Sequence, residues 1–403
     1  MSFDYESLSA IAKKTTLPAM FVDLDTFDHN VDRLKSIAER HGKKLRPATK
    51  SLRVPELIQR LMERGAPIFQ GLMCYSCQEA EFLASMGFDD LLVAYPTVQQ
   101  SDIEAAARLS NAGKTVILMI DEFEHIEILS NIWSGLAAKA PLRVCIDFDM
   151  SYRPFGDFLH LGVRRSPIRT IKQFSDLVEL ITKNDQLTLD GVMGYEAQIA
   201  GLPDQNPIQA WQNPFKALIK SLSTKDVRKK RKNVSEVLKA KNIELRFFNG
   251  GGTGCLESTA EESWLTEVTA GSGFLQSQLF DYYNANRNQP AFCFGLQVTR
   301  IPEKNTATCQ SGGFIASGET SADKSPTPFL PAGLKTFSSE GFGEVQTPLR
   351  LRTEHRIKPG DAIFFRPAKA GEIAERFNEY QLIQNGNFIK ETKTYRGLGK
   401  AFY

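Results

Sequence analysis

Several features that separate protein classes are scarce in this sequence. It has only six cysteines and five histidines among 403 residues. The cysteines form no evenly spaced framework, and no apolar signal-like segment follows Met1, so we expect reduced thiols and a cytoplasmic location. Cys74 and Cys77 make one Cys-x-x-Cys pair. That pair lacks the second pair of ligands a structural zinc site needs, so we interpret both as small buried side chains.

An excess of charge and a membrane-length apolar run are also missing. The 49 basic residues are balanced by 47 acidic ones, a formal net charge of +2, which gives no basis for nucleic acid or an anionic membrane as partner. The basic stretch at 225–241 contains Val227, Val234 and Leu238, and is expected to be a helix with one buried stripe and a solvated face. Small polar or zwitterionic ligands fit this composition best.

What is present is an alternation of short apolar runs with longer helical patterns, which is typical of βα units around a parallel sheet. A chain of 403 residues with 42% hydrophobic content is long enough for two domains. Eight runs read as strands, the number that a closed (β/α)8 barrel needs; they are residues 44–48, 67–71, 91–94, 116–120, 142–148, 190–194, 245–250 and 267–270. Helical patterns lie between them, at 53–64, 77–86, 101–111 and 122–138.

The pattern changes after about residue 290. Short strands separated by Gly, Pro and Ser turns are expected at 292–300, 313–316, 349–353 and 361–366. A further strand at 18–24 precedes the first βα unit and is expected to join this β-rich part. We therefore predict an N-terminal segment at 1–30, a (β/α)8 barrel at 31–285 and a mostly β C-terminal domain at 286–403. The stretch 318–344 is long for a plain connection, which indicates a functional or mobile loop.

Lys50 is the first candidate catalytic residue. It is the first long basic side chain after the strand that ends at Pro47 and Ala48, and barrel active sites lie at the carboxyl ends of the strands. A lysine in a partly desolvated barrel mouth has its ammonium form disfavoured, so that the neutral amine can attack an aldehyde. By position alone, an ordinary solvated lysine is the competing interpretation.

Two glycine-rich loops follow the last two predicted strands. The run Phe-Asn-Gly-Gly-Gly-Thr-Gly occupies 248–254, and Ala-Gly-Ser-Gly occupies 270–273. Backbone N–H groups of bare residues can converge on an oxyanion, and barrels often hold phosphate in these two loops. The candidate donors are Gly250, Gly251, Gly252, Thr253, Gly254, Ser272 and Gly273. A plain structural turn is the alternative.

With these motifs the sequence resembles the D-threonine aldolase and D-serine dehydratase branch of alanine-racemase-like enzymes, in an amino acid deaminase/aldolase-like subgroup. The resemblance rests on the segments at 18–30, Arg46–Lys50, 194–196, the glycine run and 267–272. It implies a fold type III enzyme with a barrel and a β-domain, pyridoxal 5'-phosphate as a Schiff base on Lys50, its phosphate in the 250–254 loop, and a homodimer with a shared active site.

The resemblance also assigns roles to two residues near predicted strand ends. Arg153 resembles the arginine near the phenolate oxygen of the cofactor; it could equally hold a substrate carboxylate or pair with Asp149 or Asp157. Tyr195 resembles the tyrosine beside the pyridine nitrogen, where its hydroxyl would donate to an unprotonated ring. A packed core aromatic is the alternative for Tyr195.

One motif of that branch is absent. The branch carries a divalent-metal pair in the β-domain, but here Lys369 stands in place of the histidine and Gly371 in place of the second ligand. Neither side chain binds a metal. The hypothesis is that Lys369, as a fixed cation, stabilises a developing β-oxyanion or the substrate carboxylate. A relocated metal bound by His355, Glu372 and Glu375, or an unimportant surface lysine, are the alternatives.

The expected activity is a lyase acting on a small D-amino acid, with a β-hydroxyl that makes aldol cleavage or dehydration possible. An amino acid racemase is the second interpretation, and it needs an acid–base group on the opposite face of the ring. A non-enzymatic cofactor-binding homeostasis protein is the third. Proteins of that kind resemble a lone barrel and would not need residues 292–403.

Overall fold

The computed structural model describes residues 3–285, 287–319, 321–352 and 356–402. The chain forms two compact units, each built from several segments. We call one the barrel unit; it contains Lys35–Lys50, Gly65–Gly271 and Phe402–Tyr403. We call the other the sheet unit; it contains Met1–Leu34, Ser51–Arg64 and Ser272–Ala401. The sequence-based boundaries at residues 30 and 285 stay a prediction.

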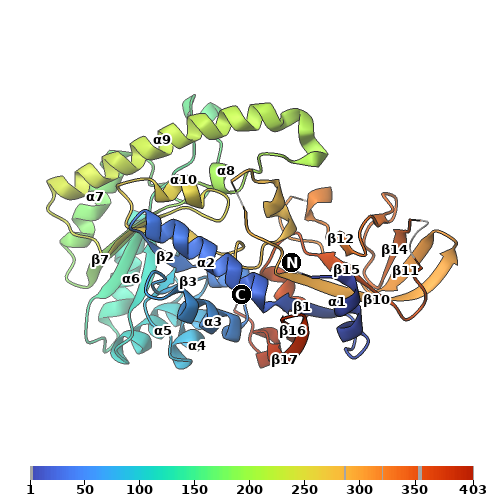
Figure 1. Cartoon of the computed structure of the whole chain (residues 1–403). Helices are drawn as coiled ribbons and strands as arrows, with labels where there is room; N and C mark the ends of the chain where they lie inside the picture. Colours follow the sequence, from blue (N-terminus) through green and yellow to red (C-terminus); the bar gives the residue numbers. More distant parts are fainter. Residues whose placement is uncertain (1–2, 286, 320, 353–355, 403) are drawn as a thin grey trace. The chain divides into compact units, whose positions relative to one another are not determined.

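The barrel unit is built on eight parallel strands, which confirms the predicted (β/α)8 class (Figure 1). The strands are β2 Lys44–Pro47, β3 Leu72–Cys74, β4 Leu91–Val93, β5 Val116–Ile120, β6 Leu142–Asp147, β7 Leu187–Gly194, β8 Phe247–Gly250 and β9 Glu267–Ala270. Their order is β2-β9-β8-β7-β6-β5-β4-β3. Isolated parallel bridges join Leu45 to Phe69 and Ala48 to Met73, so the ring closes between β2 and β3.

Helices connect the strands, as parallel pairing requires. They are α2 Leu24–Arg40, α3 Pro55–Gly65, α4 Cys77–Ser85, α5 Gln100–Asn111, α6 Phe123–Ser134, α7 Ile171–Thr182, α8 Ala197–Ala200, α9 Asn213–Ala240 and α10 Leu256–Ala260. The predicted basic helix is the second half of α9, which runs past α7 and α8 (Figure 1). Local signals mark the starts: Thr170 caps α7 in a capping box with Gln173.

Alternate residues of the strands fill the inside of the barrel, as the two-residue period of a strand dictates. Their shared core is apolar and consists of Leu92, Ala94, Ile117, Met119, Cys145, Met193 and Phe247. Continuing the alternation by one step places the next inward positions just beyond the carboxyl ends of the strands. Those positions therefore belong to the barrel mouth.

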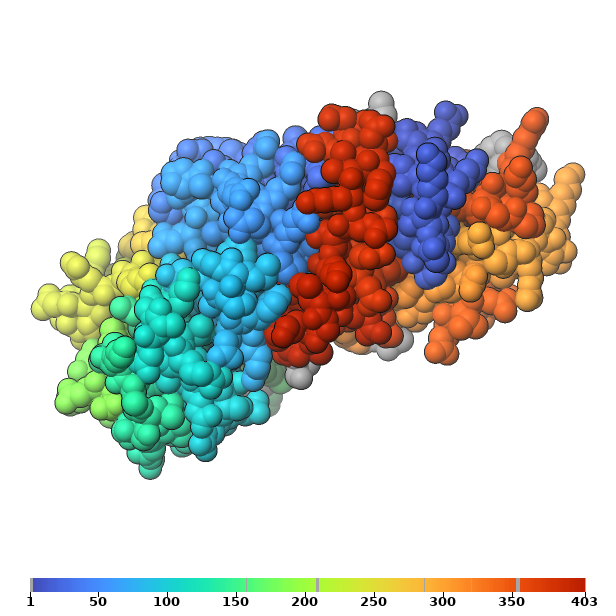
Figure 2. Space-filling view, turned by 90° about the horizontal axis from the view of Figure 1, so that it is seen from below, coloured from blue at the N-terminus to red at the C-terminus, as the bar shows by residue number. Residues whose placement is uncertain are grey.

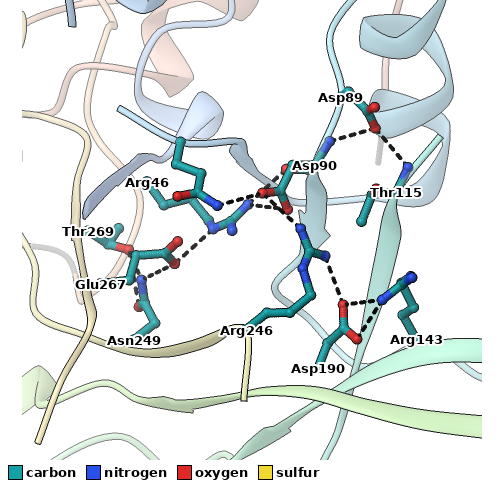
Figure 3. A network of polar contacts seen from close by, with 11 residues as sticks. Arg46, Asp89, Asp90, Thr115, Arg143, Asp190, Arg246, Asn249, Glu267 and Thr269 are labelled. Atoms are coloured by element: carbon teal, nitrogen blue, oxygen red, sulfur yellow. Dashed lines mark hydrogen bonds and ion pairs between the residues drawn. The ribbon is translucent and has the colours of Figure 1, made fainter. Parts of the chain in front are cut away.

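A partly buried polar network lies at the opposite ends of the strands (Figure 3). Asp190 is 2% exposed and accepts hydrogen bonds from Arg143 and Arg246, each at 2.8 Å. Arg46 forms an ion pair with Glu267 at 2.8 Å. Because these groups surround the amino ends of the strands, they anchor strand to strand and lie away from the barrel mouth, where barrel enzymes do their chemistry.

The described residues of the sheet unit form nine strands, which confirms the expected mostly β second domain. They are β1 Ala19–Asp23, β10 Phe292–Glu303, β11 Thr306–Gln310, β12 Thr327–Leu330, β13 Lys335–Thr336, β14 Gln346–Arg350, β15 Ala362–Arg366, β16 Glu379–Gln384 and β17 Asn387–Lys393. The strand expected at 18–24 is β1, which pairs antiparallel with β10 and parallel with β16. Helix α1 (Tyr5–Ala12) contacts β17, and Figure 2 shows this N-terminal segment beside the C-terminal strands.

Four element predictions differ from the structure in detail. The strand expected at 67–71 is instead Leu72–Cys74, because Gly71 has φ +60° and interrupts the extended backbone. The strand expected at 313–316 is absent from that described segment. There β11 ends at Gln310, and Ser311, Gly312 and Gly313 follow with positive φ. The helix predicted to reach residue 138 ends at Ser134. The stretch 318–344 contains β12 and β13 rather than one long loop.

Candidate active site

Lys50 lies at the mouth of the barrel, in the single turn Thr49–Ser51 that follows β2. The start of that turn is fixed because Ala48 N donates to Ala270 O at 2.9 Å and Thr49 Oγ1 donates to Met73 O at 3.0 Å. The Lys50 ammonium donates to Tyr95 Oη at 2.7 Å. The predicted lysine therefore sits on a rigid strand end, with a solvent-accessible amine held by a tyrosine from the segment after β4.

Close contacts and backbone conformation favour glycine at positions 250–252. A Cβ on Gly250 would come within 2.5 Å of Arg231 Nη2, and a Cβ on Gly252 within 3.2 Å of the Tyr195 ring. Gly251 has φ +87°, in the region that favours glycine. Packing thus requires bare backbone at the end of β8.

The N–H groups of this loop divide into two sets. The N–H group of Gly251 donates to Glu196 Oε2 at 3.0 Å, so this N–H group points into the body of the barrel. Within the described part of the chain, the N–H groups of Gly252 and Gly254 have no protein acceptor. Thr253 Oγ1 accepts from Gly271 N at 3.4 Å and so joins this loop to the next one. Of the predicted donors in the 250–254 loop, the N–H groups of Gly252 and Gly254 are the ones suited to an oxyanion.

Three adjacent strands bring the lysine and the loops to one sector of the mouth. The order β2-β9-β8 places Lys50 after the first strand, Gly271 after the second and the 250–254 loop after the third. Gly273 and Ser272 continue from Gly271, and Ser272 Oγ lies 3.4 Å from Ser51 Oγ within the sheet unit. A primary amine and a bare backbone loop therefore share one sector of the barrel.

Tyr195 follows β7 on the inward face, two positions after the core residue Met193. Burial raises the pKa of its phenol above the ordinary value. The guanidinium of Arg165 lies 5.8 Å from the centroid of its ring. At neutral pH the Tyr195 hydroxyl is protonated and can act as a hydrogen-bond donor.

Arg153 follows β6 and is half-buried, with a side chain 23% exposed. Its Nη2 lies 3.2 Å from Asp149 Oδ2. The ion pair that the sequence offered as one alternative is therefore present. Because a guanidinium has five N–H donors, this contact leaves the other assignments for Arg153 compatible with the structure.

Lys369 belongs to the sheet unit, in the segment after β15. Its ammonium donates to Ser317 O at 2.7 Å and Ser317 Oγ at 3.1 Å, and lies 3.9 Å from Glu372 Oε1. Glu372 also accepts from Ser317 N at 3.0 Å. Lys369 is therefore a held cation rather than a freely moving surface lysine.

Both glutamates of the alternative metal site have other partners. Glu375 pairs with Arg53 at 2.9 Å and Glu372 with Ser317, while His355 lies outside the described residues. Across the described ranges, no group of three or more His, Cys, Asp or Glu side chains is arranged to hold a metal ion.

Comparison with known proteins places the chain in a family. The sequence profile of "Alanine racemase, N-terminal domain" matches residues 22–240, more than half of the chain. The chain belongs to the alanine racemase N-terminal domain family. It is 23% identical over 256 residues to 3-hydroxy-D-aspartate aldolase of Paracoccus denitrificans, an alignment that covers 63% of this chain and 59% of that protein.

Two further similarities extend over most of the chain. It is 23% identical to D-threonine aldolase of an Arthrobacter species over 85% of this chain and 80% of that one. It superimposes on the crystal structure of D-threonine aldolase from Filomicrobium marinum with a TM-score of 0.80, at 18% identity, covering 96% of this chain and 97% of that one. These matches confirm the predicted fold, and the names of the relatives agree with the predicted branch.

The sequence analysis missed a pair of buried carboxylates on the inward face of this barrel. Asp121 follows β5 and Asp147 ends β6, at neighbouring positions because Ile120 pairs with Ile146. Both are less than 10% exposed. Burial, together with the nearby Asp121 carboxylate, raises the pKa of Asp147 to about 7. The available signal was the alternation itself, which carries the inward positions of β5 and β6 onto these aspartates.

We expect Asp147→Asn to stabilise the protein above pH 7. The folded protein keeps the Asp147 proton up to about pH 7, whereas the unfolded chain loses it near pH 4. The free energy of unfolding therefore falls as pH rises from about 4 to about 7 and stays low above that. At roughly 1.4 kcal/mol per pKa unit, the variant should gain about 4 kcal/mol at pH 8. Urea unfolding of the cofactor-free protein at pH 4.5 and pH 8 measures this, and a variant less stable than wild type at pH 8 contradicts it.

Proposed function

We propose that this protein is a pyridoxal 5'-phosphate-dependent lyase acting on a small D-amino acid with a β-hydroxyl group. The observation that carries the proposal is the shared sector of the barrel mouth, where Lys50 after β2 and the bare 250–254 loop after β8 flank β9. Family membership and the relatives named D-threonine aldolase and 3-hydroxy-D-aspartate aldolase support it. The chain spans 59% of the length of the first of these relatives.

The contacts around the glycine loop and its free N–H groups fit this cofactor. A Cβ at Gly250 would collide with Arg231 and one at Gly252 would crowd the Tyr195 ring. The Gly252 and Gly254 N–H groups have no acceptor within the described chain. Lys50 would hold the cofactor covalently, and Gly252, Thr253 and Gly254 its phosphate, with Ser272 and Gly273 from the next loop. When bound, the cofactor supplies an electron sink for the bond that breaks at Cα or Cβ of the substrate.

Two residues would orient the ring. Burial keeps the Tyr195 phenol protonated, so its hydroxyl would donate a hydrogen bond to the unprotonated ring nitrogen. The ring would then be a weaker electron sink than one with a carboxylate partner. Arg153, held by Asp149 at 3.2 Å, would place a permanent positive charge near the phenolate oxygen or the substrate carboxylate. Both roles follow the family resemblance and are consistent with the positions after β7 and β6.

Lys369 would take the electrostatic part that a metal pair plays in the aldolase and dehydratase branch. Its ammonium is held by Ser317 and faces Glu372, so it can stabilise negative charge on the β-oxygen or on the substrate carboxylate without a metal. We propose that the reaction needs no divalent metal.

The experiment that tests the reaction follows three products at once. Purified holoprotein is incubated with D- and L-threonine and with the D- and L-forms of 3-hydroxyaspartate, while aldehyde, keto acid and the enantiomer ratio are recorded. We expect glycine with an aldehyde, or a keto acid with ammonia, from the D-substrates alone. Interconversion of enantiomers without either product would replace the lyase with a racemase.

We also propose that the chain acts as a homodimer in a reducing compartment such as the cytoplasm. The six cysteines are buried and form no disulfide. An apolar groove of the barrel unit is lined by Leu161, Trp211, Phe215 and Ile219, and Trp211 is 83% exposed; the dimer that the family resemblance implies would cover such a surface. Sedimentation analysis gives the mass directly, and a monomer at micromolar concentration contradicts the dimer. No described helix combines the length and hydropathy of a membrane span.

A further inference from the structure

Arg231 is a fully buried cation in the basic second half of α9. Its side chain is 0% exposed. It lies on the buried stripe of α9, four positions after Val227 and three before Val234. Removing a guanidinium from water is costly unless carboxylates and carbonyls replace the water. The partners of Arg231 therefore show what the burial accomplishes.

Those partners lie at the carboxyl end of β7. Arg231 Nη2 donates to Gly194 O at 2.6 Å and to Glu196 Oε2 at 2.5 Å, and Nη1 donates to Glu262 Oε1 at 2.6 Å. Gly194 and Glu196 flank Tyr195 in sequence. Arg231 thus fixes the backbone that carries the proposed ring-orienting tyrosine.

Glu196, which binds Arg231, also binds the glycine loop. Its carboxylate, 1% exposed, accepts from Gly251 N at 3.0 Å, Thr259 Oγ1 at 2.5 Å and Cys255 Sγ at 3.3 Å. Burial alone would raise the pKa of Glu196, but Arg231 and these donors outweigh it and lower the pKa. Glu196 is therefore ionised, and it holds both ends of the segment that contains the proposed phosphate donors.

We propose that the Glu196–Arg231 ion pair positions the cofactor phosphate, by fixing the Gly252–Gly254 backbone in the conformation that receives it. This inference rests on the proposed function. The pair acts through the loop: Gly251 N is bound to Glu196, and Gly250 has no room for a side chain because Arg231 Nη2 occupies it. Both are positioning residues, and their effect should depend on the phosphate of the ligand.

The test compares pyridoxal 5'-phosphate with pyridoxal, which lacks the phosphate, as ligands of the cofactor-free protein. Glu196→Gln keeps the size of the side chain and removes the charge that binds Arg231. We expect it to weaken binding of the phosphorylated form by about tenfold and to leave pyridoxal affinity within about twofold. Thr259→Val, a milder change that removes one donor, should weaken only the phosphorylated form, by about threefold.

The matched control is Asp190→Asn. Asp190 is an equally buried carboxylate bound by arginines, but at the amino ends of the strands (Figure 3). Asp190→Asn should lower the thermal midpoint of the cofactor-free protein, as Glu196→Gln does. It should leave the affinities for both ligands within about twofold of wild type.

Two results would overturn the inference. One is an equal loss of affinity for both ligands in Glu196→Gln, which indicates general damage, and the other is no loss for either ligand while the thermal midpoint falls. A wild-type protein that binds neither ligand would overturn the proposed function and this inference with it. Titrations of wild type therefore come first, so that the two failures are told apart.

Discussion

Lys50→Ala should leave a folded protein that has lost the visible absorbance of a lysine-bound cofactor and nearly all turnover. Lys50 is the amine that the structure places at the end of β2. The two residues before it are fixed there, because Ala48 is hydrogen-bonded to Ala270 and Thr49 to Met73. Removing a nucleophile that forms a covalent enzyme intermediate should lower kcat by on the order of a thousandfold or more. Absorbance spectra and initial rates on the same preparations measure both effects.

Lys44→Ala is the matched control for this loss. Lys44 lies on the same strand, is exposed, and donates to Pro67 O at 2.9 Å. Its removal should leave both the spectrum and the rate unchanged. A Lys50→Ala protein that keeps the spectrum would show that another lysine binds the cofactor. A Lys50→Ala protein that keeps the rate would show that the reaction does not need covalent catalysis by Lys50.

Lys369→Ala should lower kcat by about a hundredfold to a thousandfold, the usual cost of removing one group that stabilises developing charge. Because the proposed task belongs to the reaction rather than to cofactor binding, the spectrum of the variant should match that of wild type. Lys369→Arg keeps the positive charge and should recover part of the rate. Stopped assays with a D-β-hydroxy amino acid measure it.

Lys324→Ala provides the control in the same unit. Lys324 Nζ pairs with Asp323 at 3.3 Å, so its loss removes a neighbouring lysine without touching Lys369. Dialysis of wild type against a chelator should leave the rate unchanged. Unchanged turnover in Lys369→Ala, or a rate that falls with chelator and returns with a divalent metal, would contradict the assignment of Lys369.

The barrel was predictable because its signals are local. β5 is the apolar run Val116–Ile120, and Lys50 and the 250–254 loop follow strands whose order along the chain already implies a shared edge. β3 was misplaced because the run at 67–71 is apolar, yet Gly71 turns the chain before the strand begins. Hydrophobicity alone cannot show a backbone that leaves the extended region.

The contacts that hold the site in place could not be predicted from local sequence signals. Glu196 and Arg231 are 35 residues apart, and their contact depends on how α9 packs against the end of β7. The spacing of Arg231 with Val227 and Val234 placed an arginine on the predicted buried stripe, which was the available signal. Asp121 and Asp147 meet only because β5 and β6 pair in that register.

The central claim is that Lys50 holds pyridoxal 5'-phosphate, and chemical trapping tests it most directly. Holoprotein is treated with borohydride, which reduces the bond between the cofactor and its lysine to a stable amine, and is then digested for peptide mass mapping. The account predicts one modified peptide, the one containing Lys50, with the mass of the reduced phosphorylated cofactor. Modification of a different lysine, or of none after saturation with the cofactor, would contradict it.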